Sequence, residues 1–121
     1  MKIFVVDDCV DSADLVVEIL TTLGHQVGAA YGGADGVQIL SRNSVDVILL
    51  DLRMPGMDGF QVLNELRSNS ANSRTRIVAF TGCADAATIS KMEESGFDCI
   101  LVKPVSVEAI TEALGIEAVV S

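Results

Sequence analysis

Residues 2–24, KIFVVDDCVDSADLVVEILTTLG, set an apolar strand directly before an amphipathic helix. The first residues are β-branched and apolar up to two adjacent carboxylates, which is typical of a strand covered on both faces. Residues 11–24 then repeat apolar side chains at helical spacing and end in glycine. Asp11 is a candidate N-cap and Asp14 a first-turn acid. The residues expected near one face of this helix are Leu15, Ile19, Thr22 and Leu23.

The alternation of short apolar runs and amphipathic stretches continues to the end of the chain. Further strands are predicted at residues 26–30, 45–51, 76–82 and 98–104, and further helices at residues 33–43, 60–69, 85–96 and 106–119. Strands separated by single helices run parallel and are joined by right-handed crossovers. The sequence therefore predicts an α/β fold: a doubly wound, five-stranded parallel sheet with five helices on its two faces.

Length and composition narrow the class of protein. The chain has 121 residues, enough for one domain spanning 1–121, and half of them are apolar while only 4% are aromatic. A net charge of −9 disfavours direct binding to nucleic acid or an anionic membrane and favours a cation as ligand. No apolar run approaches the length of a membrane span, and the first residues lack the features of a signal peptide. We expect a cytoplasmic protein.

The three cysteines, Cys9, Cys83 and Cys99, form no CxxC motif. This pattern argues against a disulfide framework and against a zinc site. We interpret the cysteines as reduced and mostly buried small hydrophobes.

Polar residues follow the predicted strands at the points where ligands of such sheets bind. Asp7 and Asp8 end the first strand, Asp51 the third, Thr81 the fourth and Lys103 the fifth. Where the first and third strands are neighbours, the three carboxylates converge on a hydroxyl and an ammonium. Carboxylates this close repel one another and raise the pKa of at least one of them, so the cluster calls for a cation.

The residue types at these strand ends indicate a particular chemistry. Oxygen ligands without histidine or cysteine suit a hard ion, and Mg²⁺ suits an acidic site that also handles phosphate. Thr81 and Lys103 add a hydrogen-bond donor and a point charge for phosphoryl oxygens. An anion held against a carboxylate by a cation is the arrangement expected for an aspartyl phosphate.

The segments VVDD, LLDLRMPGMDG, FTG and LVKP, in this order, resemble the receiver domain of two-component response regulators over essentially the whole chain. The resemblance implies a (βα)5 flavodoxin-like fold and a phosphorylation-dependent signalling switch. It implies that Asp51 accepts a phosphoryl group from a histidine kinase or a histidine phosphotransfer protein. A downstream protein or an attached domain is then the second partner.

The same resemblance implies roles for the other strand-end residues. Asp7 and Asp8 help to hold Mg²⁺ together with Asp51, Asp8 more directly, and the backbone carbonyl of Arg53 completes the protein's ligands. Thr81 binds a phosphoryl oxygen and shifts on phosphorylation. Lys103 pairs with the phosphoryl group, and Pro104 presents it.

The sequence departs from the family pattern at one informative position. Three residues before the lysine the family usually has an aromatic residue or histidine that swings inward, and here that residue is Ile100. A two-state aromatic rotamer is therefore not available for the readout. Arg53 and Cys83 stand at positions that the family leaves variable, so no rate of hydrolysis follows from them. The segment SGFDCILVKPV resembles receivers of hybrid sensor kinases as much as free-standing regulators.

Two other functions remain open. A small phosphatase that forms an aspartyl phosphate places a second aspartate two residues after the nucleophile, and that position is Arg53. The preferred interpretation is therefore no enzyme in the usual sense, but a domain that catalyses only its own phosphotransfer and dephosphorylation. A binding module with a vestigial cleft is favoured only by Ile100. Flavin binding is excluded because no phosphate-cradling loop follows the first strand.

Overall fold

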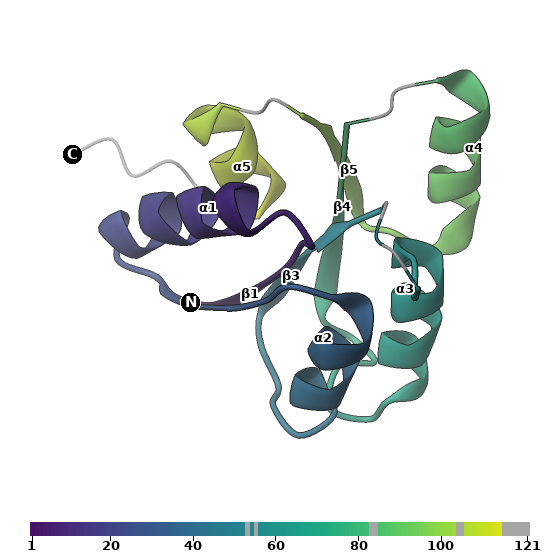
Figure 1. Ribbon diagram of the computed structural model, residues 1–121, viewed down its shortest axis with the longest axis horizontal. Helices are drawn as coiled ribbons and strands as arrows, with labels where there is room; N and C mark the ends of the chain where they lie inside the picture. Colours follow the sequence, from purple (N-terminus) through teal and green to yellow (C-terminus); the bar gives the residue numbers. More distant parts are fainter. Residues whose placement is uncertain (53, 55, 83–84, 104–105, 115–121) are drawn as a thin grey trace.

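The computed structural model describes residues 1–52, 54, 56–82, 85–103 and 106–114. These residues alternate strand and helix, as predicted (Figure 1). The strands are β1 (Lys2–Val6), β2 (Gln26–Ala30), β3 (Val47–Asp51), β4 (Arg76–Thr81) and β5 (Cys99–Val102). The helices are α1 (Val10–Thr22), α2 (Gly33–Leu40), α3 (Gly59–Ser68), α4 (Ala86–Ser95) and α5 (Val107–Ala113).

All strand pairs are parallel, and the sheet order is β2-β1-β3-β4-β5. The predicted doubly wound sheet is confirmed, and so is the expectation that the first and third strands are neighbours. Because all five strands point the same way, their carboxyl ends lie along one edge of the sheet. That edge is where the predicted site residues were expected to meet.

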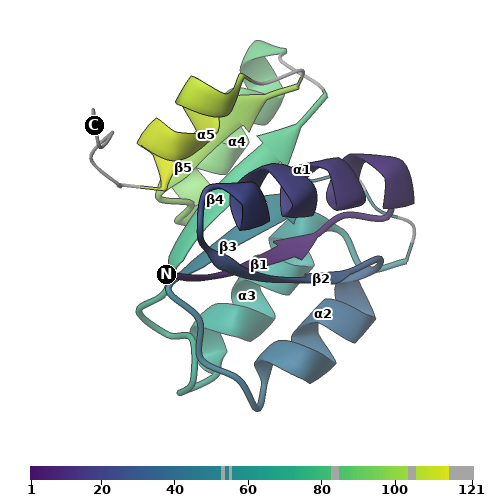
Figure 2. The ribbon, with the colours of Figure 1, turned by 90° about the vertical axis from the view of Figure 1, so that its left-hand side faces the viewer.

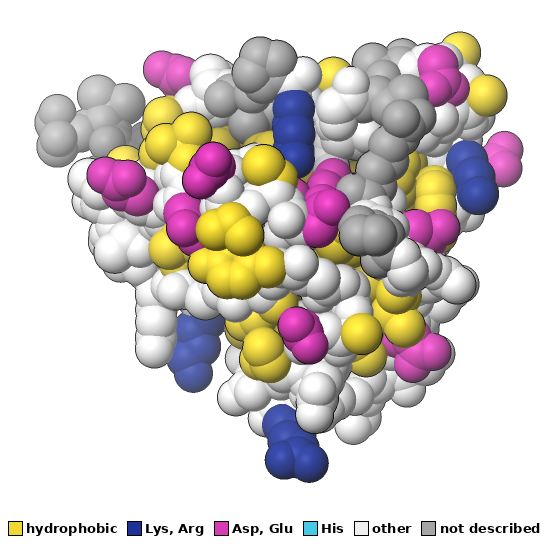
Figure 3. Space-filling model, viewed as in Figure 1, with side chains coloured by type: hydrophobic (Ala, Val, Ile, Leu, Met, Phe, Trp, Pro, Cys, Tyr) yellow, Lys and Arg dark blue, Asp and Glu magenta, His cyan; other side chains and the backbone are white. Residues whose placement is uncertain are grey.

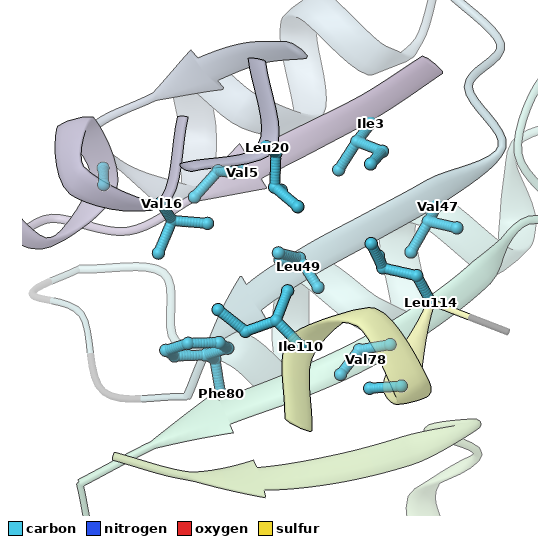
Figure 4. Packing of buried hydrophobic residues seen from close by; sticks show 12 residues of the cluster. Ile3, Val5, Val16, Leu20, Val47, Leu49, Val78, Phe80, Ile110 and Leu114 are labelled. Atoms are coloured by element: carbon cyan, nitrogen blue, oxygen red, sulfur yellow. The ribbon is translucent and has the colours of Figure 1, made fainter. Parts of the chain in front are cut away.

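Helices cover both faces of the sheet. Figure 2 shows α1 and α5 on one side and α2 and α3 on the other. On the first side, Val5, Leu49 and Val78 of the strands pack against Val16 of α1 and Ile110 of α5 (Figure 4). Alternate strand residues pack toward the second side, where the buried residues include Phe4, Val6, Ile48 and Leu50 from the strands and Val62, Leu63 and Leu66 from α3. Each fully buried aliphatic side chain stabilises the fold by about 1.5–3 kcal/mol relative to exposure.

Helix α1 turns a different face to the core than the sequence pattern indicated. Leu15 is 58% exposed, whereas Val16 and Leu20 are buried. Apolar residues fill two neighbouring stripes of this helix, so helical spacing fits both, and the stripe that contains Ala13 is the buried one. The complete set of buried residues in α1 is Ala13, Val16 and Leu20.

The start of α1 is also different from the prediction. The N-cap is Cys9, which makes no side-chain capping hydrogen bond, and Asp11 lies in the first turn. Asp58, in contrast, is an N-cap whose side chain does cap its helix, α3. Its side chain accepts a hydrogen bond from the Gln61 backbone N–H, and the Gln61 side chain accepts one from the Asp58 N–H. This reciprocal capping box satisfies two donors that the helix itself leaves unpaired.

Two helices end differently from the prediction or beyond the residues that can be compared with it. Helix α2 ends at Leu40 rather than at residue 43. Helix α5 is described as far as Ala113, and the rest of the predicted helix to residue 119 lies largely outside the described residues. Among the residues that the structure describes, no helix combines the length and apolar character that a membrane crossing requires.

Candidate functional site

The carboxyl edge of the sheet brings together residues that lie far apart in the sequence. Asp51 is the last residue of β3 and pairs with Phe80 of β4. Asp7 follows β1 directly, one step beyond the pair formed by Val6 and Leu50. Its backbone N–H donates to the Ala30 carbonyl at 3.1 Å, which extends the ladder to β2. Parallel pairing therefore places Asp7 beside Asp51.

Asp7, Asp8 and Asp51 form a compact acidic cluster. Each offers one carboxylate oxygen, and these three oxygens all lie within 4.8 Å of one another. Asp7 is 3% and Asp51 6% exposed, while Asp8 is open to solvent. An oxygen-only donor set, with two buried members and one accessible from water, fits a hard divalent ion such as Mg²⁺, which keeps several of its waters.

Lys103 reaches this cluster from β5. Its Nζ lies 2.9 Å from Asp7 Oδ2 and 3.8 Å from Asp51 Oδ1. The Asp7 carboxylate also accepts a hydrogen bond from the Cys9 backbone N–H, at 3.0 Å from Oδ1. Both oxygens of Asp7 are thus engaged, and the ammonium lies closer to Asp7 than to Asp51. In the space-filling view, acidic side chains and one basic side chain lie close together near the ends of the central strands (Figure 3).

The two buried carboxyls respond to this arrangement in opposite ways. Burial acts to raise the pKa of Asp7, but the hydrogen bonds from Lys103 and the Cys9 N–H, with the charge of Lys103, bring it below its usual value. Burial raises the pKa of Asp51 to about 7, and the negative charge of Asp7 adds to the rise. Lys103 opposes that rise from a greater distance. Asp51 is therefore the carboxyl whose ionisation most needs an added cation.

Thr81 ends β4 next to this cluster and is fully buried. Its carbonyl accepts a hydrogen bond from the Lys103 backbone N–H at 2.7 Å, which ties the end of β4 to the residue that follows β5. The structure thus brings Asp7, Asp8, Asp51, Thr81 and Lys103 to one edge. Arg53, Cys83 and Pro104 lie outside the described residues.

Other residues singled out in the sequence lie away from this cluster or behave differently. Ile100 is half-buried and packs against the cluster formed by Leu52, Ala79 and Met92, beneath α4. Cys9 is exposed, so the prediction of mostly buried cysteines is wrong at this position, and Cys99 is half-buried. Cys9 follows the strand end, where the chain leaves the core to begin α1.

Two contributions to the site were not anticipated. The Cys9 backbone N–H holds Asp7, and a backbone donor leaves no trace in the sequence. The ring centroid of Phe80 lies 5.4 Å from the Lys103 Nζ. The sequence does show an aromatic residue directly before Thr81. At this strand end, however, only the hydroxyl group of Thr81 was considered as part of the site.

The sequence profile of the response regulator receiver domain matches residues 3–115. The chain is 35% identical over 118 residues to the sensor histidine kinase RcsC of Salmonella typhi, covering 98% of this chain and 12% of the kinase. It is 32% identical to the probable chemotaxis protein CheY of Rhizobium etli, covering 94% of this chain and 89% of that protein. The chain therefore corresponds to nearly the whole of one relative and to a small part of the other.

Solved structures agree with this assignment. The chemotaxis protein CheY4 of Vibrio cholerae superposes with a TM-score of 0.88 at 27% identity, covering 94% of this chain and 95% of that chain. The receiver domain of a Pseudomonas aeruginosa sensor histidine kinase, solved with magnesium coordinated in its active-site cleft, gives a TM-score of 0.86 at 26% identity, covering 93% of each chain. The chain belongs to the response regulator receiver domain family, the phosphorylation-dependent switches of two-component signalling.

Proposed function

We propose that Asp51 is the phosphoacceptor of this receiver and that its donor is a phosphohistidine of a histidine kinase or a histidine phosphotransfer protein. The observation that carries the proposal is the environment of Asp51. Its buried carboxylate lies beside two other carboxylates, with the Lys103 ammonium 3.8 Å away. Relatives named as a sensor histidine kinase and as sporulation initiation phosphotransferase F support a donor of this class.

In the transfer, an oxygen lone pair of Asp51 attacks the phosphorus of the donor. The bond between phosphorus and the histidine nitrogen breaks, and its electron pair stays on the imidazole. The reaction needs Asp51 ionised, whereas burial and Asp7 favour its protonated form by raising its pKa to about 7. Bound Mg²⁺ would supply the positive charge that offsets both this repulsion and the charge of the phosphoryl oxygens.

The ligands that we propose for Mg²⁺ are the carboxylates of Asp7, Asp8 and Asp51. The backbone carbonyl of Arg53 joins them by resemblance to the family. Lys103 and Thr81 are proposed to bind phosphoryl oxygens. Lys103 has the reach for this role because its ammonium already lies between Asp7 and Asp51.

We propose that residues 1–121 form one receiver domain, working in the cytoplasm, whose phosphorylated form favours a different protein partner. It turns over no external metabolite and catalyses only its own phosphotransfer and dephosphorylation. The arginine at position 53 favours a receiver over a phosphatase, because phosphatases of this class place an aspartate two residues after their nucleophile. The net charge of −9 supports a protein rather than nucleic acid or an anionic membrane as the direct partner.

The test is thermal unfolding with and without millimolar Mg²⁺ and beryllofluoride, a mimic of the phosphoryl group. We expect Mg²⁺ to raise the midpoint of the wild type, and beryllofluoride to raise it further in the presence of Mg²⁺. Asp51→Asn should lose the response to beryllofluoride. Asp35→Asn makes the same chemical change at an exposed position of α2 and should respond like the wild type.

A covalent readout complements the thermal one. Acetyl phosphate with Mg²⁺ should label the wild type with an acid-stable, base-labile acyl phosphate, and Asp51→Asn should remain unlabelled. Stoichiometric labelling of Asp51→Asn would reject Asp51 as the acceptor. A wild type that neither additive stabilises would favour the binding module with a vestigial cleft. Sustained hydrolysis of phosphomonoesters at enzyme-like rates would favour the phosphatase.

A further inference from the structure

Phe80 occupies the position on β4 that lies beside Asp51 on β3. Paired residues of neighbouring parallel strands project from the same face of a sheet. Phe80 is 5% exposed and belongs to the hydrophobic cluster beneath α1 and α5. Figure 4 shows it at the carboxyl end of β4, with Ile110 of α5 nearby. An aromatic ring therefore borders the acidic cluster on its β5 side.

The route of the Lys103 side chain makes this ring important. Lys103 follows β5, whereas Asp51 lies on β3 and Asp7 follows β1, so β4 stands between the lysine and both carboxylates. Neighbouring strands lie about 4.8 Å apart, and the lysine must cross β4 to reach either acid. It does cross, since its ammonium lies 2.9 Å from Asp7 and 3.8 Å from Asp51. On this route the Nζ lies 5.4 Å from the Phe80 ring centroid.

Phe80 also borders the hollows on both sides of this crossing. It lines the small cavity beside Asp7 and Asp51, and it lines the groove between α1 and α5 that Lys103 borders. The ring therefore lies at the boundary between the acidic cluster and the apolar cluster beneath α1 and α5. An ammonium within about 6 Å of a ring centroid is attracted by the ring quadrupole, and more strongly where water is excluded. An aliphatic side chain of similar size fills the same space without that attraction.

We propose that Phe80 is a positioning residue for Lys103. Its ring lines the path of the lysine across the end of β4 and holds the ammonium in reach of both carboxylates, so that the phosphoryl oxygens of Asp51 receive a lysine that is already ordered. Fixing a free lysine side chain is entropically unfavourable, and the ring lowers that cost before the phosphoryl group arrives. The catalytic part of this inference rests on the roles proposed above for Asp51 and Lys103. The placement of the lysine by the ring does not.

The chain offers a direct test of the placement, because it contains three lysines: Lys2, Lys91 and Lys103. In NMR spectra of the metal-free protein, a ring beneath an ammonium shifts the neighbouring ε-methylene signals upfield. Lys2 is exposed and serves as the unshifted reference. Lys91 lies 4.3 Å from the Phe60 centroid and serves as the positive reference. Lys103→Arg assigns the third signal.

We expect the Lys103 signal to be upfield of that of Lys2 in the wild type and in Phe80→Tyr, and to lose this shift in Phe80→Leu. Phe60→Leu should move the Lys91 signal and leave that of Lys103 in place. Retention of the upfield signal in Phe80→Leu, with dispersed amide signals that show a folded protein, overturns the proposal.

The second measurement is the affinity for beryllofluoride at saturating Mg²⁺. Phe80→Leu should bind it about three- to tenfold more weakly, the size expected for a partly buried cation–π contact. Phe80→Tyr should restore the affinity, and Phe60→Leu should not alter it. The affinity for Mg²⁺ alone should change less than about twofold, whereas general disruption of the strand ends would weaken both. Equal beryllofluoride affinity in Phe80→Leu and wild type overturns the proposal. A wild type that binds no beryllofluoride rejects the proposed function instead, and the lysine spectrum still decides the placement.

Discussion

Asp7 and Asp51 lie side by side at the ends of neighbouring parallel strands, yet their pKa values move in opposite directions. The difference follows from how one ammonium is divided between them. Lys103 Nζ is 2.9 Å from Asp7 and 3.8 Å from Asp51, and the Cys9 N–H also donates to Asp7. Asp7 is thus stabilised as an anion, while Asp51 is buried directly beside that anion. The site is asymmetric before any ion or phosphoryl group arrives.

Removing the charge of Asp51 should stabilise the metal-free protein at high pH. The pKa of Asp51 is about 7 in the folded protein and lower in the unfolded chain, so at any pH between these two values folding takes up protons. The free energy of unfolding therefore falls as the pH rises through this window. Above pH 7 the full cost of burying the ionised carboxylate applies. Asp51→Asn should therefore raise the free energy of unfolding by about 2 kcal/mol at pH 8, and by clearly less at pH 5. Urea unfolding in EDTA at both pH values measures this. Equal gains at the two pH values would contradict the buried charge as cause, and Asp35→Asn should show no such difference.

Replacing Lys103 should lower the stability of the metal-free protein, strengthen the binding of Mg²⁺ and weaken the binding of beryllofluoride. Lys103→Met leaves Asp7 without its closest cation, and we expect a loss of about 2 kcal/mol in metal-free protein at pH 8. The same change removes a competitor for the carboxylates, so Mg²⁺ should bind more tightly, while beryllofluoride should bind more weakly. Isothermal titration with Mg²⁺, followed by titration with beryllofluoride at saturating Mg²⁺, measures the two affinities separately. Lys91→Met is the matched control, because Lys91 lies on α4 over the Phe60 ring rather than against the acidic cluster's ion pairs. Weaker Mg²⁺ binding by Lys103→Met would contradict the competition.

The fold was predictable because short apolar runs, typical of buried strands, alternate along the chain with stretches whose apolar residues recur at helical spacing. Apolar runs such as residues 47–50 are buried throughout, and an amphipathic stretch follows each strand. The meeting of Asp7 with Asp51 was predictable for the same reason, since parallel strands bring their carboxyl ends to one edge. The position of a residue at a strand end predicts which other residues lie close to it, but it does not predict its hydrogen-bond partner.

The remaining features depend on distances that periodicity does not encode. Whether Lys103 lies closer to Asp7 or to Asp51 is decided by less than 1 Å. The buried face of α1 was predicted wrongly because Leu15 and Val16 belong to adjacent apolar stripes, and helical spacing alone does not choose between them. The cation–π contact of Phe80 required the path of a side chain from another strand. Arg53, expected to contribute a carbonyl, stays a prediction.

The capping box of α3 makes a local contribution that can be isolated. Asp58→Ala removes the acceptor for the Gln61 N–H and should lower the free energy of unfolding by about 1 kcal/mol. Gln61→Ala should have a smaller effect, because it leaves that bond intact and frees only the exposed Asp58 N–H. Urea unfolding of the single and double variants gives the coupling between them. Strictly additive losses would contradict reciprocal capping.

Gly59 connects the stability of α3 to the geometry of the site. It is the first residue of α3, and a Cβ there would lie 2.8 Å from both the Asp51 carbonyl oxygen and the Leu52 Cα. Because both contacts are backbone atoms of Asp51, the proposed phosphoacceptor, and its neighbour Leu52, Gly59→Ala must displace either the helix or the end of β3. We expect a loss of about 2 kcal/mol and weaker binding of Mg²⁺.

The matched control for this change is Gly32→Ala, since a Cβ at Gly32 meets nothing within 4 Å. Gly32→Ala should leave the affinity for Mg²⁺ unaltered. It should lower the free energy of unfolding by at most about 1 kcal/mol, the difference between glycine and alanine at an N-cap. Urea unfolding and Mg²⁺ titration of both variants make the comparison. Destabilisation by Gly59→Ala with normal Mg²⁺ affinity would show that the helix yields and the end of β3 stays in place. Loss of both shows that the close approach of α3 to β3 is what holds Asp51 in position for its ligands.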